Sequence, residues 1–285
     1  MRVRPSSCVV FRSPPDRARP RLGTFGTMST STADKATTLK QLHEAPEILR
    51  VVNVWDAISA KVVSDLPGTR AIATAGHSIA ASAGYDDGGM PLDVALAGAA
   101  TIAAATDLPV TADLDDGYAD PAETIRRASG AGIVGANVED RLRPFDESVA
   151  RVAAITAAAR AEGIDFQLNA RTDAIARGGD RPLDESIEDA IARGKAFLDN
   201  GAALVFVPGA IQRDVVERLV AGLGRGKLSV IGLPGALPAA EYQELGVARI
   251  SYGPLTQRVA LRALRDLATD LYGGGVVPED TPALN

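Results

Sequence analysis

Carboxylates follow two short apolar runs in the middle of the chain. Asp113 and Asp115 end the run that begins at Val110, and Glu139 ends the run that begins at Gly135. Side chains two residues apart on a strand point to the same side, so we expect Asp113 and Asp115 to face together. Neighbouring strands lie about 4.8 Å apart, which brings Glu139 close to both. Three carboxylates this close repel one another unless a cation lies among them.

The composition narrows the kind of cation. The chain has one cysteine, Cys8, and two histidines, His43 and His77, which excludes an internal disulfide and zinc sites built from thiolates or several imidazoles. Oxygen ligands favour Mg²⁺, with Mn²⁺ as its substitute. The alternative is that these acids cap helices or end strands in solvent. Three acids at two adjacent strand ends favour the metal site.

A third polar segment supplies positive charge. Asn169-Ala170-Arg171-Thr172-Asp173 follows another apolar run. An arginine beside a metal suits bidentate binding of a substrate carboxylate. Its alternative role is an ion pair with Asp173 or Glu139, which needs no ligand.

Four other residues need an interpretation of their own. His77 follows Gly76 at a predicted strand end, where its imidazole could carry a proton, or where only its backbone amide matters. Trp55 fits a packing residue better than a stacking platform. The hydroxyl of Tyr118 either faces substrate or makes a structural hydrogen bond. His43 lies in a polar helix before the first strand, and we expect it at the surface.

The elements that must position these residues alternate along the chain from residue 37. The eight predicted strands are Leu49–Val54, Ala71–Ala75, Val110–Asp113, Gly135–Glu139, Phe166–Ala170, Leu204–Val207, Leu228–Gly232 and Arg249–Tyr252. The predicted helices between and after them are Ala57–Leu66, Leu92–Ala105, Ala122–Ala131, Glu147–Glu162, Leu183–Asp199, Arg213–Leu223, Ala239–Leu245 and Leu255–Leu271.

Strict alternation of strand and helix indicates an α/β protein with a parallel sheet and right-handed crossovers. Eight units of about 32 residues each are typical of a closed (β/α)8 TIM barrel, whose active site lies at the carboxyl ends of the strands. The alternative is a doubly wound open sheet. Its first strand usually leads into a Gly-rich phosphate turn, whereas here the segment is Asn53-Val54-Trp55-Asp56.

The two ends of the chain differ from its body. Residues 1–27 carry six arginines, one aspartate and four prolines without a helical or strand period, so we expect a disordered extension over residues 1–34. Met28 and the polar run after it favour an over-extended start over a transit peptide. The barrel is expected over residues 35–272, and the Gly- and Pro-containing residues 273–285 should form a flexible tail.

Charge and hydropathy exclude two classes of partner. The arginine-rich start has a net charge of +5, which leaves −11 on the other 258 residues and argues against binding nucleic acid or an anionic membrane. The best candidate for a membrane span, Val94 to Thr106, is far shorter than the roughly 20 residues that a bilayer requires. We expect a cytoplasmic protein that binds a small-molecule carboxylate.

In their order, these segments resemble the isocitrate lyase and phosphoenolpyruvate mutase superfamily. Each segment alone is a weak signal, but together they span residues 53 to 252 and form a specific pattern. The matching segments are Asn53–Ala57, Ala75–Ser78, Asp113–Tyr118, Asn137–Asp140 and Asn169–Ala174, with weaker matches at Val205–Gly209 and Glu244–Arg249.

The resemblance implies a Mg²⁺-dependent barrel that acts on small 2-oxo acids or phosphoenolpyruvate-like compounds through an enolate. By position, Asp113, Asp115 and Glu139 would correspond to the metal shell, directly or through waters. Arg171 would correspond to the substrate-binding arginine. Mg²⁺ acting as a Lewis acid on the oxo group would stabilise the enolate.

The resemblance also implies a substrate-binding turn and a gating loop. The backbone around Gly76 and His77 would receive the substrate's carboxylate or oxo group, with Trp55 and Ala75 beside it. The loop from Ala83 to Met90 would close over the site, and Asp87 would be its mobile acid. The family implies a homotetramer in which the last helix, Leu255–Leu271, is exchanged or packed between subunits.

Departures from the family pattern narrow the reaction. Lyases of isocitrate and methylisocitrate carry a Lys-Lys/Arg-Cys-Gly-His stretch shortly after the metal-binding glutamate, and mutases carry Lys-Thr-Asn in that region. Residues Asp140–Asp146 contain neither, which disfavours both those lyases and a conventional phosphoryl mutase. We expect a carbon–carbon lyase, such as an oxaloacetate-type decarboxylase or a retro-aldol enzyme acting on a substituted malate. The alternatives are a carbon–phosphorus hydrolase or mutase and a non-catalytic anion-binding barrel; Asp87 together with the three acids favours an enzyme.

Overall fold

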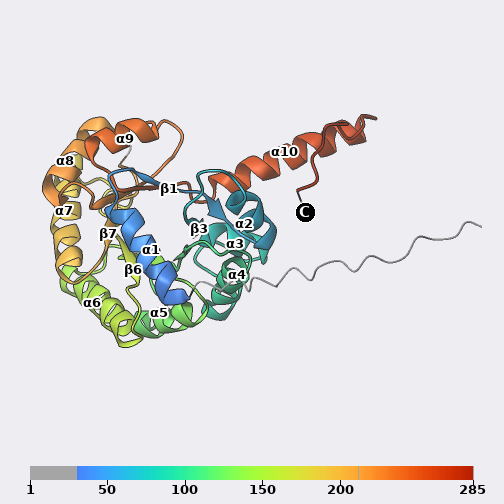
Figure 1. The fold of residues 1–285 in the computed structure, drawn as a ribbon. Coiled ribbons are helices and arrows are strands. Elements are labelled where there is room, and N and C mark those ends of the chain that lie inside the picture. The colour runs from blue at the N-terminus through green and yellow to red at the C-terminus, as the bar shows by residue number, and fades with distance from the viewer. Residues whose placement is uncertain (1–30, 211, 285) are drawn as a thin grey trace, which may run out of the picture.

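The computed structural model describes residues 31–210 and 212–284, so the expectations for residues 1–27, including Cys8, and for Met28 fall outside the described residues. Nine parallel strands form one sheet in the order β1-β9-β8-β7-β6-β5-β4-β3-β2. The sheet curves into a barrel with helices on its outside (Figure 1). The predicted TIM-barrel fold is therefore confirmed.

The first predicted strand is divided in two. It forms β1 (Leu49–Val51), which pairs with β9, and β2 (Asn53–Val54), which pairs with β3. One segment thus joins both edges of the sheet, which closure of a tilted barrel requires. The other strands are β3 (Ile72–Thr74), β4 (Val110–Asp113), β5 (Gly135–Glu139), β6 (Gln167–Arg171), β7 (Leu204–Phe206), β8 (Leu228–Ile231) and β9 (Arg249–Ser251).

Most helices match the predicted ranges to within two residues, and one was not predicted. Helix α3 (Gly76–Ser82) follows β3 directly, and its seven residues are too few to show a helical period in the sequence. The remaining helices after the first strand are α2 (Ala57–Ser64), α4 (Leu92–Ala104), α5 (Pro121–Gly130), α6 (Phe145–Ala161), α7 (Leu183–Asp199), α8 (Arg213–Leu223), α9 (Ala239–Leu245) and α10 (Leu255–Tyr272).

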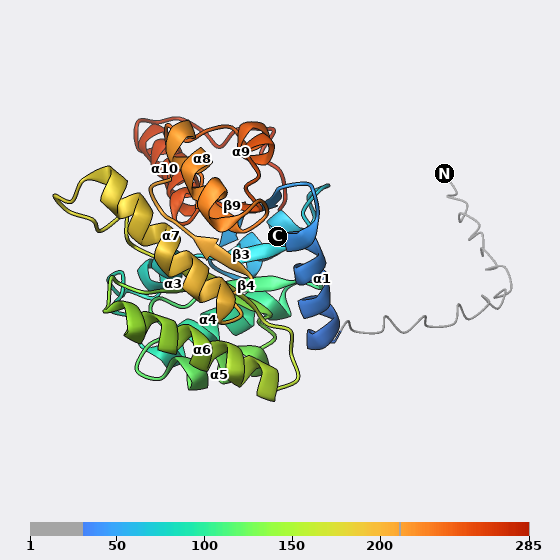
Figure 2. The ribbon, with the colours of Figure 1, turned by 90° about the vertical axis from the view of Figure 1, so that its left-hand side faces the viewer.

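Helix α1 (Thr32–Glu44) covers the amino-terminal end of the barrel. It begins before the expected boundary at residue 35, because Ser31 and Asp34 form a reciprocal capping box at its start. Figures 1 and 2 show it against this end of the sheet, and its Leu39 is fully buried. The expectation that His43 lies at the surface is wrong: the side chain is only 4% exposed, since α1 turns this face toward the barrel.

Helix α10 leaves the barrel and projects from it (Figure 1). Its first turn is attached to the barrel, and Gln257 is its buried residue. Three apolar side chains farther along, Val259, Leu261 and Leu264, are 71%, 54% and 62% exposed. The helix therefore presents an apolar surface that this single chain does not cover.

Across residues 31–210 and 212–284, no helix combines the length and the apolar character needed to span a membrane. The cytoplasmic location expected from the sequence stays a prediction. After α10, residues 273–284 form turns and irregular, exposed backbone.

Candidate active site

A cavity of about 570 Å³ opens at the carboxyl ends of the strands. In this barrel architecture that is the end where active sites are built. The structure brings six of the predicted residues together along its wall: His77, Asp87, Asp113, Asp115, Glu139 and Arg171. They come from five separate segments of the chain, so the fold alone assembles them.

Asp113 and Asp115 face the cavity for a different reason from the one predicted. Strand β4 ends at Asp113, and Asp115 lies in a turn with a left-handed backbone (φ 49°). The turn needs Gly117, which has φ 83° and where a Cβ would lie 2.7 Å from the Cβ of Pro121. The carbonyl of Asp115 accepts a hydrogen bond from the amide of Glu139 at 2.8 Å, which joins the two acidic segments.

Asp113 is held from two sides by the neighbouring strand and helix. Its amide donates to the hydroxyl of Thr74 at 3.0 Å, and its Oδ2 accepts from the amide of Gly76 at 3.1 Å. Burial raises the pKa of Asp113 to about 6, and the charge of Asp115 adds to this. The Gly76 amide, predicted to receive substrate, therefore orients a carboxylate of the protein.

Glu139 and Arg171 form the centre of an ion-pair network. Arg171 Nη1 lies 2.9 Å from Glu139 Oε2, and its Nε lies 2.7 Å from Asp173 Oδ1, so both pairings considered from the sequence are present. Arg141 Nε contacts the other oxygen of Glu139 at 2.9 Å. Arg171 also lies over the ring of Phe206, 5.9 Å from its centroid. These contacts fix the guanidinium of Arg171 in one orientation beside the cavity.

The donor chemistry of this wall suits a hard divalent cation. Burial raises the pKa values of Asp113, Asp115 and Glu139, so each carboxylate is held where ionisation is unfavourable. A bound cation would relieve that cost with oxygen ligands of the kind Mg²⁺ prefers. In the described part of the chain, however, no three His, Cys, Asp or Glu side chains converge into a metal-binding group. Glu139 instead faces three arginines, Arg141, Arg171 and Arg177.

His77 and Asp87 meet at the mouth of the cavity. His77 Nδ1 lies 3.4 Å from Asp87 Oδ2, and their side chains are 36% and 63% exposed. His77 lies in the first turn of α3, and Asp87 lies in the loop that follows this helix. At Gly88 in the same loop, a Cβ would lie 3.8 Å from Arg141. The loop therefore lies beside Arg141 of the cavity wall, and its role as a gate stays a prediction.

Two of the predicted residues, Ala75 and Trp55, do not line the cavity, and Tyr118 lies beside Asp115. Ala75 is buried immediately before α3, and Trp55 is half-buried and packs against the core. Neither contributes to the cavity wall. Tyr118 has a left-handed backbone (φ 58°), and burial raises the pKa of its phenol, with the nearby charge of Asp115 adding to this. The packing interpretation of Trp55 fits this arrangement.

The sequence analysis missed several residues of the cavity wall. Arg141, Arg177 and Arg258 bring further positive charge, and Phe206, Ile231 and Leu233 form part of an apolar side. Arg141 directly follows Glu139-Asp140, which is a signal that could have identified it. Arg258 lies inside a helix and Arg177 in a loop. Neither residue ends a strand, and the end of a strand is the position from which active-site residues of a barrel are predicted.

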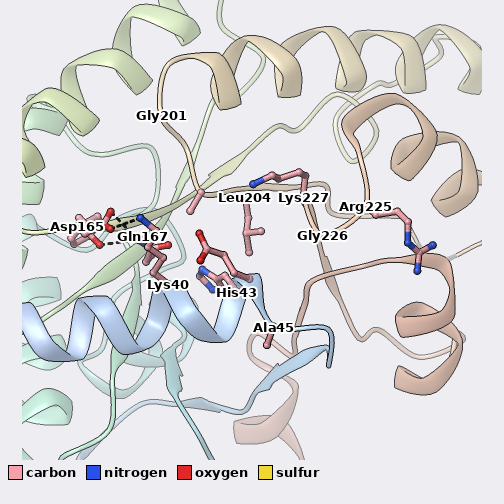
Figure 3. A pocket seen from close by; sticks show the side chains of 13 residues that line it. Lys40, His43, Ala45, Asp165, Gln167, Gly201, Leu204, Arg225, Gly226 and Lys227 are labelled. Atoms are coloured by element: carbon pink, nitrogen blue, oxygen red, sulfur yellow. Dashed lines mark hydrogen bonds and ion pairs between the residues drawn. The ribbon is translucent and has the colours of Figure 1, made fainter.

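A second cavity of about 380 Å³ lies at the opposite end of the barrel, where α1 covers the sheet (Figure 3). Lys40, His43 and Lys227 line it, and Lys40 pairs with Asp165 at 2.8 Å. Burial lowers the pKa of His43 to about 3, and the charge of Arg249 adds to this. The imidazole is therefore neutral at pH 7. This end of the barrel lacks the acidic wall of the first cavity.

Comparison with known proteins supports the resemblance. A family model described as phosphoenolpyruvate phosphomutase matches residues 39–272. The 2,3-dimethylmalate lyase of Eubacterium barkeri is 27% identical over 257 residues, which are 83% of this chain and 86% of that protein.

Two solved structures have the same fold along most of their length. Oxaloacetate acetylhydrolase is 27% identical, with a TM-score of 0.78 over 89% of this chain and 92% of that one. A Burkholderia cenocepacia J2315 protein, provisionally described as a phosphonomutase, is 36% identical, with a TM-score of 0.78 over 86% of this chain and all of that one. With the fold and the acidic wall described above, these matches show that the chain belongs to the phosphoenolpyruvate mutase family of the isocitrate lyase superfamily.

Proposed function

We propose that this protein is a Mg²⁺-dependent lyase that cleaves a carbon–carbon bond in a small 2-oxo acid or substituted malate through an enolate. One observation carries the proposal: Asp113, Asp115, Glu139 and Arg171 gather on one wall of the cavity at the strand ends. Relatives named as a dimethylmalate lyase and an oxaloacetate acetylhydrolase support it.

The acidic wall would hold the metal, and Arg171 would hold the substrate. Asp113, Asp115 and Glu139 would bind Mg²⁺, with Mn²⁺ as a substitute, and the cation supplies Lewis-acid stabilisation of negative charge on the substrate's oxo group. Arg171 is fixed by Glu139 and Asp173. A guanidinium held in this way needs little reorganisation to pair with a substrate carboxylate.

His77 and Asp87 would handle the proton. With 3.4 Å between Nδ1 and Oδ2, the carboxylate can hold the imidazole in one orientation. The pair lies at the loop side of the cavity, so it would protonate the enolate carbon or accept a hydroxyl proton from a malate. Closure of the loop over the apolar side chains of Ile231 and Leu233 would exclude water from the enolate.

We also propose that the protein is a homotetramer. The exposed apolar side chains of α10, including Val259, Leu261 and Leu264, support packing of this helix against another copy.

Carbon–phosphorus chemistry is the second candidate. The descriptions of the family model and of the Burkholderia relative favour it. Against it stands the segment Asp140–Asp146, which lacks the Lys-Thr-Asn stretch of the mutases.

A substrate panel separates the two candidates. The full chain is incubated with Mg²⁺ and, in turn, oxaloacetate, 2,3-dimethylmalate and phosphonopyruvate, and the products are followed by proton and phosphorus NMR. The proposal expects carbon–carbon cleavage of at least one of the first two compounds and its loss with a chelator. Turnover of phosphonopyruvate alone would replace the proposal with the second candidate.

A further inference from the structure

Most of the positive charge in the active-site cavity is already paired. Arg171 contacts Glu139 and Asp173, and His77 contacts Asp87. Arg141 lies 2.9 Å from Glu139 and 3.6 Å from Asp116. Arg177 lies 2.9 Å from Asp173 and 3.8 Å from Glu139. A substrate anion that binds one of these groups competes with a carboxylate of the protein.

Arg258 is different. Arg258 lines the same cavity but makes no ion pair with any acid in residues 31–210 or 212–284. The side chain is exposed in the single chain and precedes the apolar side chains of α10 that would pack against another copy. An anion that binds Arg258 displaces only water.

The backbone that carries Arg258 is fixed to the barrel. In the first turn of α10, the hydroxyl of Thr256 donates to the carbonyl of Asn53 at 2.7 Å. The amide group of Gln257 donates to the carbonyl of Ser78 at 3.1 Å. The backbone of Arg258 therefore has a defined position, although the rest of α10 projects from the molecule.

This position lies across the barrel from Glu139. Arg258 follows β9, and Glu139 ends β5. With β1 and β2 counted as one strand, the sheet order places three strands between β9 and β5 in either direction. Apolar side chains, among them Ile231 and Leu233, line the cavity as well. The cavity thus has Glu139 on one side and an unpaired arginine on the other.

We infer that Arg258 binds the distal carboxylate of a dicarboxylate substrate and makes the enzyme prefer 2-oxo diacids to 2-oxo monoacids. This assignment rests on the proposed function, which places the 2-oxo acid group of the substrate at the acidic wall. The distal group of a diacid then extends toward the opposite side, where Arg258 offers a charge-assisted, bidentate partner.

Two five-carbon probes test the assignment. 2-Oxoglutarate and 2-oxovalerate share the 2-oxo acid group and differ at the far end, where one has a carboxylate and the other a methyl group. Neither is a β-oxo acid, so both should survive a calorimetric titration of the full chain with Mg²⁺. We expect tighter binding of 2-oxoglutarate, and Arg258→Ala should weaken this binding alone by about 10- to 100-fold, the usual value of a hydrogen bond to a charged group.

Matched variants separate the role of Arg258 from a general effect of charge. Arg258→Lys should keep part of the preference, because the charge remains while the bidentate geometry is lost. Arg262→Ala removes an exposed arginine one turn farther along α10 and should change neither affinity.

The outcomes distinguish the inference from the proposed function. Equal affinities of the wild-type protein for both acids, or equal losses for both in Arg258→Ala, would overturn the assignment of Arg258 and leave the proposed function standing. Failure of both acids to bind the wild-type protein would overturn the 2-oxo acid site and the assignment with it.

Discussion

Asp113 shows at the scale of one residue how a bound cation would change the stability of the protein. Its pKa is raised to about 6 by burial and by Asp115, so the folded protein without metal retains a proton that the unfolded chain releases above pH 3.8. The free energy of unfolding therefore declines as the pH rises from 3.8 to about 6. A divalent cation at the carboxylate would reverse that cost, because it favours the ionised form.

Substitutions of Asp87 and of its neighbour Asp86 test whether the acids of this loop act in catalysis or only keep the loop soluble. In the described structure Asp87 contacts His77 and lines the cavity, whereas Asp86 is exposed and does not line it. We expect Asp87→Ala to lower kcat about 100-fold or more, as the loss of a general acid–base group does, with a small change in KM. Asp86→Ala should stay close to wild type. Equal, small effects of both substitutions in steady-state assays would remove Asp87 from the catalytic residues.

The lowered pKa of His43 predicts how the free energy of unfolding depends on pH. Its folded-state pKa of about 3 lies below the ordinary value of 6.5, so the unfolded chain binds protons first as the pH falls. The resulting loss of stability begins below pH 6.5 and reaches roughly 3 to 6 kcal/mol near pH 3. His43→Leu should remove this part of the acid sensitivity.

The substitution should cost little at pH 8, because neither ring nitrogen of His43 has a hydrogen-bond partner among residues 31–210 and 212–284. Urea unfolding between pH 8 and pH 4 measures the effect, with His77→Leu as the control at the other end of the barrel. An identical pH dependence in His43→Leu and wild type would contradict the prediction.

The sequence predicted the residues at strand ends better than those elsewhere. Asp113, Glu139 and Arg171 each end an apolar run, and the barrel architecture then brings them to one rim. The partners of Arg171 were open alternatives, because a strand-end position does not reveal which acid turns toward it. The burial of His43 depends on where α1 packs, and a polar helix gives little sign of that.

At the scale of elements, most boundaries followed from hydrophobic periodicity, but two features did not. The division between β1 and β2 arises because one strand must pair with both edges of the sheet. Helix α3 is too short to show a period, although it carries His77 and leads into the predicted gating loop. The divided strand depends on closure of the barrel, and the short helix shows no period. A local window of sequence therefore reveals neither feature.

The link between α3 and α10 can be tested directly. Gln257 is buried and donates to the carbonyl of Ser78 at 3.1 Å and to the hydroxyl of Ser82 at 2.9 Å. Gln257→Leu should lower the free energy of unfolding by about 1–3 kcal/mol, because both hydrogen bonds from the Gln257 amide group to α3 are lost. Hydrogen exchange should accelerate in residues 76–90 and stay unchanged in α6 (Phe145–Ala161). Unchanged exchange in residues 76–90 would show that Gln257 does not hold α3.

At the scale of the whole molecule, α10 is the helix whose apolar side chains stay exposed in the single chain. If it packs against another copy, a charge on its apolar surface should disrupt assembly. We expect a tetramer for the wild-type protein by light scattering and smaller species for Leu264→Glu, whose position is 62% exposed in the single chain. Glu substitution at Ala221, an exposed position on α8, is the control. A monomeric wild-type protein would contradict the proposed tetramer.

The central claim is that the acidic wall supports metal-dependent enolate chemistry on a 2-oxo acid. Exchange of the methyl protons of pyruvate in deuterium oxide, followed by proton NMR, reports enolate formation without requiring the natural substrate. The account predicts exchange with Mg²⁺, none with a chelator, and a loss of about 100-fold or more in Asp115→Ala and Glu139→Ala. Exchange that persists at the same rate without metal, or in both variants, would contradict it.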